Sequence, residues 1–363
     1  MNCYYLAREL AKRHEVHIFC SGSETKDEII DKIHVHRHKE LLRIKYYLAF
    51  YPRIVHTLMQ SKLDILHVHG FGFLQHDYAI RRLKKAQPAL KLVCTPHGPF
   101  MALKSYGFTA RLFRSIYTPR IQKNIQSYDR IIAVNPKQHL WMKKLYSIPQ
   151  SKIRVVPNGI SKEALVSVGK KEQERYAKHY GLQGTRVISY LGRIQAYKGI
   201  DQTIRALPAT IKKIPNTLLL IMGKDSGDRA RLEQIAQELG ITKNVFFTGV
   251  VSEREKRALL SLTDIFVFPS EWEAFGIVVL EAMAQGAAII STKTEGGTYL
   301  VIPGVNGYLY EFGDINALTK KLLSILKKPA LRKRMGKANK KKAKNFLWID
   351  IAHILEKVYV ELM

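Results

Sequence analysis

Short runs of β-branched and aliphatic residues alternate along the chain with longer stretches in which apolar residues recur every three or four positions. The short runs predict strands, and the longer stretches predict amphipathic helices. In the first half, strands are expected at 16–20, 33–36, 64–69, 92–95, 130–134 and 153–156, and helices at 43–58, 75–85, 109–126 and 136–146. In the second half, strands are expected at 186–191, 217–222, 245–247, 265–268 and 287–291, and helices at 201–214, 229–239, 253–262 and 276–285.

Strand–helix alternation of this kind predicts an α/β fold, with parallel sheets covered by helices on both faces. At 363 residues the chain exceeds what one hydrophobic core usually organises, so we expect two domains. A strand ends in the turn sequence Val-Pro-Asn-Gly at 156–159, which marks the boundary. We therefore predict two Rossmann-like domains, residues 1–157 and 158–345, that face a central cleft. Because open sheets bind ligands at the carboxyl ends of their strands, motifs that follow strands carry most weight.

Charge is the unusual feature of the composition. There are 59 Lys and Arg against 30 Asp and Glu, a formal net charge of +29. Residues 78–128 and 315–349 are rich in Lys and Arg and contain no acidic residue. Such segments attract polyanions, although a merely solvated basic surface is the alternative. Because neither segment carries a groove-reading motif or interleaved aromatics, nucleic acid is an improbable partner, and we expect 78–128 to face an acidic membrane.

The sequence contains no apolar run as long as a spanning helix requires. Near the N-terminus, Arg8, Glu9 and Lys12 interrupt any apolar core of a signal peptide. We therefore expect a cytoplasmic protein that is peripheral on the inner face of the cell membrane. Three scattered cysteines offer no zinc motif, and no Asp-x-Asp pair is present, so no metal or other cofactor is expected.

The first chemical motif follows the strand at 186–191 and opens the next helix. It runs from Gly192 to Gly199 and includes Arg193 and Lys198. Glycine allows the backbone to approach a ligand closely, and a helix N-terminus offers amide groups to an anion. Two cations in the same loop are suited to neutralise a diphosphate. The alternative is an ordinary strand–helix turn with two surface cations.

The second motif follows the strand at 265–268. Glu273 lies in the loop, Phe275, Gly276 and Ile277 begin a helix, and Glu281 follows in an otherwise apolar helical stretch. A carboxylate in such a stretch is costly unless a partner satisfies it. A ribose diol is one such partner, and a lysine from elsewhere in the fold is the alternative. The three residues at the helix start place their amides where phosphate or sugar oxygens would bind.

These two motifs together resemble the donor site of family 4 glycosyltransferases with the GT-B fold. Four further motifs match this family in the same order, at 95–98 (Thr-Pro-His-Gly), 156–159, 296–297 (Gly-Gly) and 304–309. The resemblance covers most of the chain. It also implies that residues 346–363 form a helix that returns to the first domain.

What the resemblance implies is a retaining, metal-independent transferase that moves a sugar from a nucleotide diphosphate sugar to an acceptor hydroxyl. Arg193 and Lys198 would hold the diphosphate, Glu281 the ribose and Glu273 the transferred sugar. His97 would reach across the cleft toward a sugar hydroxyl or the reaction centre. A lipid-linked or polysaccharide glycan is the expected acceptor. The alternatives are a sugar-nucleotide epimerase or a phosphorylase of the same fold, or a non-catalytic, degenerate transferase that binds polyanions or membranes.

The sequence departs from this family at its start. Members begin with a strand and a glycine-rich loop before a helix that resembles residues 5–13, and this chain opens inside that helix. We therefore expect the sheet of the first domain to lack one strand, with lower stability and activity as the consequence.

Overall fold

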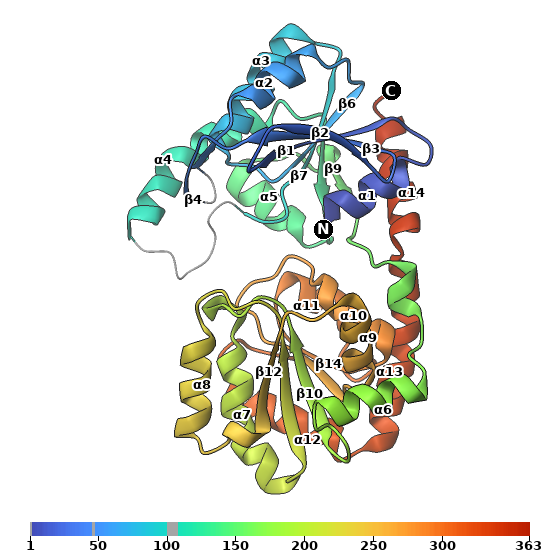
Figure 1. Cartoon of the computed structure of the whole chain (residues 1–363). Helices are drawn as coiled ribbons and strands as arrows, with labels where there is room; N and C mark the ends of the chain where they lie inside the picture. Colours follow the sequence, from blue (N-terminus) through green and yellow to red (C-terminus); the bar gives the residue numbers. More distant parts are fainter. Residues whose placement is uncertain (1, 46–47, 100–107) are drawn as a thin grey trace. The chain divides into compact units, whose positions relative to one another are not determined.

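The computed structural model describes residues 2–45, 48–99 and 108–363. The chain forms two compact units. Unit 1 comprises residues 1–158 and 348–363, and unit 2 comprises residues 159–347 (Figure 1). The two connections leave unit 2 side by side, because the amide of Ile160 donates to the carbonyl of Phe346 at 2.7 Å. The first of these connections passes through the turn at 156–159.

Unit 2 contains a six-stranded parallel sheet in the order β12-β11-β10-β13-β14-β15. The strands are β10 (Arg186–Leu191), β11 (Thr217–Met222), β12 (Val245–Gly249), β13 (Ile265–Phe268), β14 (Ala288–Thr292) and β15 (Gly307–Tyr310). The chain first winds outward from β10 to β12 and then returns to begin again at β13, beside β10. In open α/β sheets, ligands bind at this kind of switch point, beyond the carboxyl ends of the strands.

Helices cover both faces of the unit 2 sheet, as the strand–helix alternation predicts (Figure 1). One face packs on α7 (Ile200–Lys213), α8 (Arg229–Glu238) and α12 (Ile315–Leu326). The other contacts α10 (Ile277–Gln285), α11 (Glu295–Leu300) and α13 (Pro329–Ala343), while α9 (Glu253–Ser261) packs between α10 and α6 (Lys170–His179). Because successive strand residues point to opposite faces, Ile188 and Tyr190 enter the first of these cores together.

The described residues of unit 1 form three sheets. Its strands are β1 (Val16–Gly22), β2 (Lys26–Ile30), β3 (Ile33–Lys39), β4 (Leu42–Lys45), β5 (Leu48–Phe50), β6 (Ile65–His69), β7 (Lys91–Thr95), β8 (Arg130–Ala133) and β9 (Ile153–Val155). The largest sheet is parallel, in the order β6-β7-β8-β9. In the second, β3 lies between a parallel β1 and an antiparallel β2, and β4 and β5 form a small antiparallel ladder.

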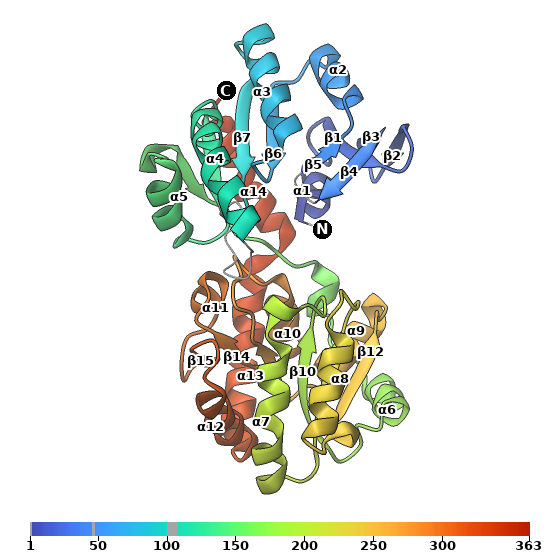
Figure 2. The same cartoon turned by 90° about the vertical axis from the view of Figure 1, so that its left-hand side faces the viewer.

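The parallel strand pairs of unit 1 are therefore divided between two sheets. Strands β1 and β6 each pair on one side only, and each is half-buried along its whole length, whereas β7 and β8 are almost fully buried (Figure 2). Strand β2 escaped prediction because Lys-Asp-Glu-Ile-Ile is mostly polar, as an exposed outer strand allows.

The helices of unit 1 are α1 (Asn2–Leu10), α2 (Arg53–Gln60), α3 (Leu74–Ala86), α4 (Phe108–Ile125), α5 (Gln138–Tyr146) and α14 (Trp348–Val360). The helix predicted at 43–58 is wrong over its first part, where β4 and β5 lie instead. Helix α2 begins only after Pro52, which lacks an amide hydrogen and suits a helix start. The Gln75 side chain also holds the preceding backbone extended, because it accepts from the Tyr51 amide at 2.7 Å and donates to the Tyr51 carbonyl.

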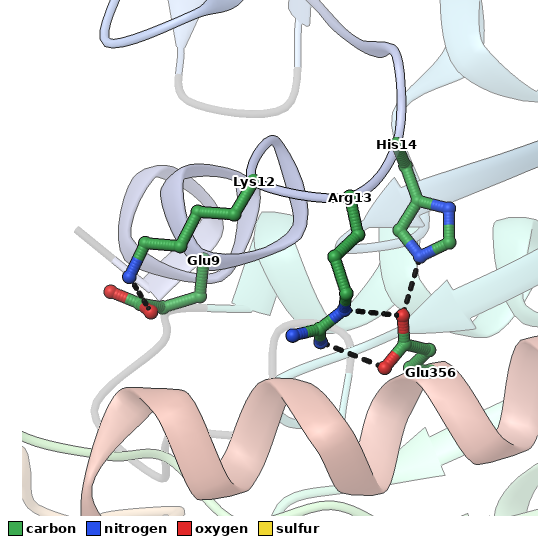
Figure 3. A network of polar contacts seen from close by, with 5 residues as sticks. All are labelled: Glu9, Lys12, Arg13, His14 and Glu356. Carbon is green, nitrogen blue, oxygen red and sulfur yellow. Dashed lines mark hydrogen bonds and ion pairs between the residues drawn. The ribbon is translucent and has the colours of Figure 1, made fainter.

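Helix α14 is tied to unit 1 by a polar network (Figure 3). Arg13 donates two hydrogen bonds to the carboxylate of Glu356, at 3.0 and 2.8 Å, and the His14 ring contacts the same carboxylate at 2.6 Å. Hydrogen bonds from Arg13 and then His14 lower the pKa of Glu356 to about 2. At the other end of the helix, Trp348 stacks on Tyr5, with ring centroids 5.7 Å apart. The last helix therefore belongs to the first domain.

Candidate functional site

The two chemical motifs of unit 2 lie next to each other because β10 and β13 are neighbouring strands. The loop at 192–199 follows β10, and the loop at 269–276 follows β13. Backbone and side-chain bonds join them: the Glu271 amide donates to the Tyr197 carbonyl at 2.8 Å, and Gln202 donates to the Pro269 carbonyl at 3.1 Å. The sheet order therefore brings together residues that are some eighty positions apart in the sequence.

Lys198 and Glu273 form an ion pair at the centre of this arrangement. The Nζ of Lys198 donates to Oε2 of Glu273 at 2.7 Å, and the two side chains are 12% and 22% exposed. Burial alone would lower the pKa of Lys198, but the Glu273 carboxylate outweighs that effect, and the pKa is raised. Lys198 is therefore a cation at neutral pH. The Tyr197 ring lies beneath it, with its centroid 4.6 Å from Nζ.

Arg193 provides a second cation in the same loop. Its backbone is fixed, since the Tyr190 hydroxyl donates to the Arg193 carbonyl at 2.9 Å. Its side chain is exposed and donates to the Tyr197 hydroxyl at 3.2 Å. Gly192 begins the loop, and its amide donates to the Met222 carbonyl of the neighbouring strand β11. The loop thus presents one half-buried and one exposed cation on a braced backbone.

Two helices begin at this site, and both are preceded by a glycine in the left-handed region. Gly199 has φ +62° before α7, and Gly276 has φ +90° before α10. A Cβ at Gly199 would lie 2.3 Å from the Pro269 carbonyl oxygen, so only glycine fits there. Neither helix has a side-chain cap, so the first-turn amides of α10, with Phe275 and Ile277 on either side of Gly276, are available to an anion.

The Gly-Gly motif at 296–297 packs against the loop at 269–276. The amide of Gly296 donates to the Glu273 carbonyl at 3.0 Å. A Cβ at Gly296 would lie 2.2 Å from the Phe275 carbonyl oxygen, so the backbones approach closely here. The motif at 296–297 therefore positions Glu273 and does not itself present functional side chains.

Glu281 lies in the second turn of α10 and has a partner within unit 2. Lys256 of α9 donates to its Oε1 at 2.7 Å. Burial raises the pKa of Glu281, and the Lys256 ammonium opposes that rise. The lysine pairing considered from the sequence is thus present, although the sequence did not identify Lys256. No local sequence pattern predicts this contact, because it depends on how α9 and α10 pack.

His97 belongs to unit 1, in the loop that follows β7. It is one of the non-glycine residues with positive φ, at +60°. Its Nε2 lies 3.1 Å from Nδ1 of His69, and burial lowers the pKa of His97 to about 4. His67, on the same strand as His69, contacts the hydroxyls of Thr95 and Tyr359 at 2.7 and 2.6 Å. The His97 ring is therefore neutral, and His69 orients it. The part of His97 in the reaction stays a prediction.

Two family models match the chain in succession. The model described as Glycosyltransferase Family 4 matches residues 2–164, and the model described as Glycosyl transferases group 1 matches residues 172–342. The chain is a glycosyltransferase, and its resemblance to family 4 is supported. The first match ends at residue 164, shortly after unit 2 begins at residue 159, so each model covers most of one structural unit.

Curated glycosyltransferases are similar over most of their length. The chain is 25% identical to N-acetyl-alpha-D-glucosaminyl L-malate synthase of Bacillus anthracis over 341 residues, 91% of this chain and 85% of that one. It is also 25% identical to phosphatidyl-myo-inositol mannosyltransferase of Mycobacterium leprae over 321 residues, 87% of this chain and 78% of that one.

Solved structures share the GT-B fold. Sucrose-phosphate synthase of Thermosynechococcus elongatus aligns with a TM-score of 0.80 and 21% identity, over 98% of this chain and 91% of that one. Anabaena Alr3699/HepE in complex with UDP and glucose aligns with a TM-score of 0.77 and 18% identity, over 99% and 95%. The predicted α/β fold with Rossmann-like parallel-sheet domains is confirmed.

Two features are absent from residues 2–45, 48–99 and 108–363 of this glycosyltransferase. In these ranges no cluster of three or more His, Cys, Asp or Glu is arranged to hold a metal ion. No helix there combines the length and the apolar character that crossing a membrane requires.

Proposed function

We propose that this glycosyltransferase takes its sugar from a nucleotide diphosphate donor bound at the ends of β10 and β13. The observation that carries the proposal is the Lys198–Glu273 ion pair of 2.7 Å, set between the N-termini of α7 and α10. The two adjacent loops, 192–199 and 269–276, together provide a cation, a carboxylate and uncapped helix amides, which are the groups that bind the phosphates and the sugar of such a donor. The phosphates need positive charge, and the sugar needs hydrogen-bond acceptors.

The diphosphate would contact Lys198, Arg193 and the amides of Phe275, Gly276 and Ile277. Negative charge grows on the diphosphate as the bond to the sugar breaks, and fixed cations and amides stabilise that charge without reorganisation. When the donor is bound, the Lys198 ammonium would share its hydrogens between Glu273 and the phosphate. Glu273 would then accept from hydroxyls of the transferred sugar, and Glu281 from the ribose.

The transfer would retain the configuration of the sugar. The acceptor hydroxyl would attack the anomeric carbon on the face from which the nucleoside diphosphate departs, forming the new carbon–oxygen bond as the old one breaks. The hydroxyl proton would pass to the departing phosphate oxygen. In favour of this route, Glu273 is held by Lys198 as an acceptor, an arrangement that suits orienting hydroxyls. Proton NMR of the product reads its anomeric configuration directly.

Metal ions would not be needed, because Lys198 and Arg193 would supply the positive charge for the leaving group. Turnover that is equal in chelator and in excess magnesium supports this part. Turnover abolished by chelator and restored by magnesium would contradict it.

The acceptor would be a glycan or lipid-linked hydroxyl at an acidic membrane surface, met by a cytoplasmic enzyme. The curated relatives named above are an N-acetyl-alpha-D-glucosaminyl L-malate synthase and a phosphatidyl-myo-inositol mannosyltransferase. Helix α4 supports the membrane part. It carries no acidic residue, and Phe108, Leu112 and Ile116 are 79%, 50% and 58% exposed at intervals of one turn. Exposed Arg120 and Lys123 follow on the same helix. Apolar and cationic side chains together are the features of a helix that lies in a membrane interface.

Thermal-shift screening with UDP, GDP and ADP and their glucose and mannose esters tests the donor site. A ligand that binds only the folded protein stabilises it by about 2.7 kcal/mol at a hundredfold excess over Kd. We expect one nucleotide to raise the melting temperature clearly, and the Lys198→Ala variant to show a smaller rise. UDP is the first candidate, because Anabaena Alr3699/HepE was solved in complex with UDP and glucose. If none of the nucleotides shifts the wild-type protein, the donor assignment fails.

A further inference from the structure

Lys256 lies in the interior of unit 2, which is an unusual place for an ammonium group. It is 8% exposed and belongs to α9, which packs against α10. Lysine is almost never buried unless an anion pairs with it. Its Nζ donates to Oε1 of Glu281 at 2.7 Å and to Oε1 of Glu253 at 2.8 Å. Of these two carboxylates, Glu253 is exposed to solvent and needs no cation, whereas the Glu281 side chain is only 14% exposed.

The ion pair decides the charge and the orientation of Glu281. Burial raises the pKa of the Glu281 carboxyl and the Lys256 ammonium opposes that rise, so loss of the cation would raise this pKa further. A protonated carboxyl is a weaker acceptor than a carboxylate. Lys256 binds Oε1, which leaves Oε2 as the oxygen for an incoming hydroxyl group.

We infer that Lys256 is a positioning residue for the ribose of the donor: it orients Glu281 and keeps it ionised without touching the nucleotide. This inference rests on the proposed function, which assigns Glu281 to the ribose. Lys256 approaches from a different helix, so the ribose contact depends on how α9 packs against α10. The competing explanation is that Lys256 serves only to neutralise a buried charge in the folded protein.

Calorimetric titration with UDP separates these explanations. The proteins are the wild type, Lys256→Met, Glu281→Gln and the double variant, each measured from about pH 5, just above the ordinary pKa of a glutamate carboxyl, to about pH 8. UDP itself titrates here, so the ratio of each Kd to that of the wild type is the readout. We expect Lys256→Met to bind roughly tenfold more weakly near pH 8, as loss of a charged hydrogen bond does, and progressively more weakly as the pH falls.

Glu281→Gln provides the matched comparison, because it keeps the shape and loses the titrating group. Its ratio to the wild type is expected to stay constant with pH. Since Lys256 acts through Glu281, the double variant should bind UDP no more weakly than Glu281→Gln alone. Lys256→Arg, which keeps the cation, should restore most of the affinity. Melting curves of each variant accompany the titrations. If Lys256→Met does not fold, Lys256→Gln carries the same comparison, because an amide donates a hydrogen bond without a charge.

A constant ratio for Lys256→Met across the pH range would overturn the inference. So would a double variant weaker than Glu281→Gln by the full factor of the Lys256 change. Either result leaves the donor site itself intact, because the wild type still binds UDP. A wild type that binds none of UDP, GDP and ADP defeats the proposed function instead, so the two failures are distinguishable.

Discussion

Lys198 and Glu273 lie 75 positions apart in sequence, and their side chains are joined by an ion pair of 2.7 Å. Each residue follows a strand, and the two strands are hydrogen-bonded neighbours at the point where the sheet order reverses. The pair is mostly shielded from solvent, so it is screened less by salt than a surface pair. A phosphate that enters this site therefore meets a cation that is already oriented.

Lys198→Ala is expected to reduce kcat/KM for the donor by roughly a hundredfold, about 2–3 kcal/mol, as removal of a fixed stabiliser of developing charge does. Arg193→Ala should produce a loss of the same order if its exposed side chain turns onto the phosphates. Steady-state kinetics with the donor found by thermal shift measures both.

Lys213→Ala is the matched control for these variants, because Lys213 is exposed at the far end of the helix that Lys198 precedes. It removes the same charge from the same unit and should leave kcat/KM within about twofold, since surface substitutions away from a site change little. Equal kinetics for Lys198→Ala and Lys213→Ala would show that the cation of the loop has no part in donor use.

From the sequence we could predict which two loops form the site. We could not predict which side chains in it form ion pairs. Strand order in an α/β sheet follows rules, so motifs after the strands at 186–191 and 265–268 were expected at one edge. The Lys198–Glu273 contact depends on side-chain conformations that no local pattern encodes. The Lys256–Glu281 contact depends further on the packing of α9 against α10. In the sequence alone, Lys256 cannot be distinguished from the other charged residues of a solvent-exposed helix.

Fold prediction succeeded where burial is two-sided and failed where it is partial. The central strands of unit 2, β10, β11, β13 and β14, are almost fully buried and appear as largely apolar runs, such as Ile265–Phe268. At 43–58, Leu, Ile and Val recur at helical spacing, but the first part pairs as β4 and β5 before Pro52. The exposed strand β2, with its polar composition, gave no strand signal at all.

Helix α4 is expected to bind acidic vesicles, and loss of its exposed stripe should weaken that binding. One of its faces packs Tyr117, Ile121 and Ile125 into the core of unit 1, so the exposed residues form a second apolar face without a partner in that core. Changing Leu112 and Ile116 to Ser removes apolar area worth roughly 1.5–3 kcal/mol per fully buried side chain. Sedimentation with vesicles of acidic and of neutral lipid, at low and high salt, measures the change.

The charge contribution is tested separately with Arg120→Gln and Lys123→Gln, each expected to weaken binding to acidic vesicles by about 1 kcal/mol at low salt. Lys212→Gln together with Lys213→Gln, on α7 of unit 2, removes the same charge and should change nothing. Lys104 of the basic segment lies outside the described residues. Equal sedimentation with neutral and acidic vesicles, or none with either, would leave α4 as an ordinary basic surface.

Glu356→Gln is expected to loosen α14 from unit 1 and lower the free energy of unfolding by about 1–3 kcal/mol, because Arg13 loses two charge-assisted hydrogen bonds. The pKa of Glu356 in the folded protein is lowered to about 2. A carboxyl whose pKa falls on folding stabilises the protein above its ordinary pKa, and this stabilisation is lost as the pH falls through about 2. Urea unfolding of wild type and variant should therefore differ at neutral pH and converge in acid. Asp350→Asn, exposed on the same helix, is the control, and an equal deficit in both variants would contradict the role of the network.

Gly199→Ala is expected to damage both stability and donor use, and Gly240→Ala to damage stability alone. Both glycines have nearly the same backbone, with φ +62° and +66°, so each alanine incurs the same left-handed strain of about 1–2 kcal/mol. A Cβ at Gly240 meets nothing within 4 Å, whereas one at Gly199 would lie 2.3 Å from the Pro269 carbonyl oxygen.

That carbonyl belongs to the loop that carries Glu273, so relief of the clash must separate the two loops of the donor site. The same Cβ would also lie 2.4 Å from Nε2 of Gln202, so the difference between the two alanine variants isolates the crowding at residue 199 from the strain common to both. We expect Gly199→Ala to melt at a lower temperature than Gly240→Ala and to bind the donor nucleotide at least about tenfold more weakly, since a misplacement near 1 Å is costly at a preorganised site. Gly240→Ala should bind it like the wild type. Nucleotide affinity that is equal in the two variants would mean that the approach of residue 199 to residue 269 does not position the donor site.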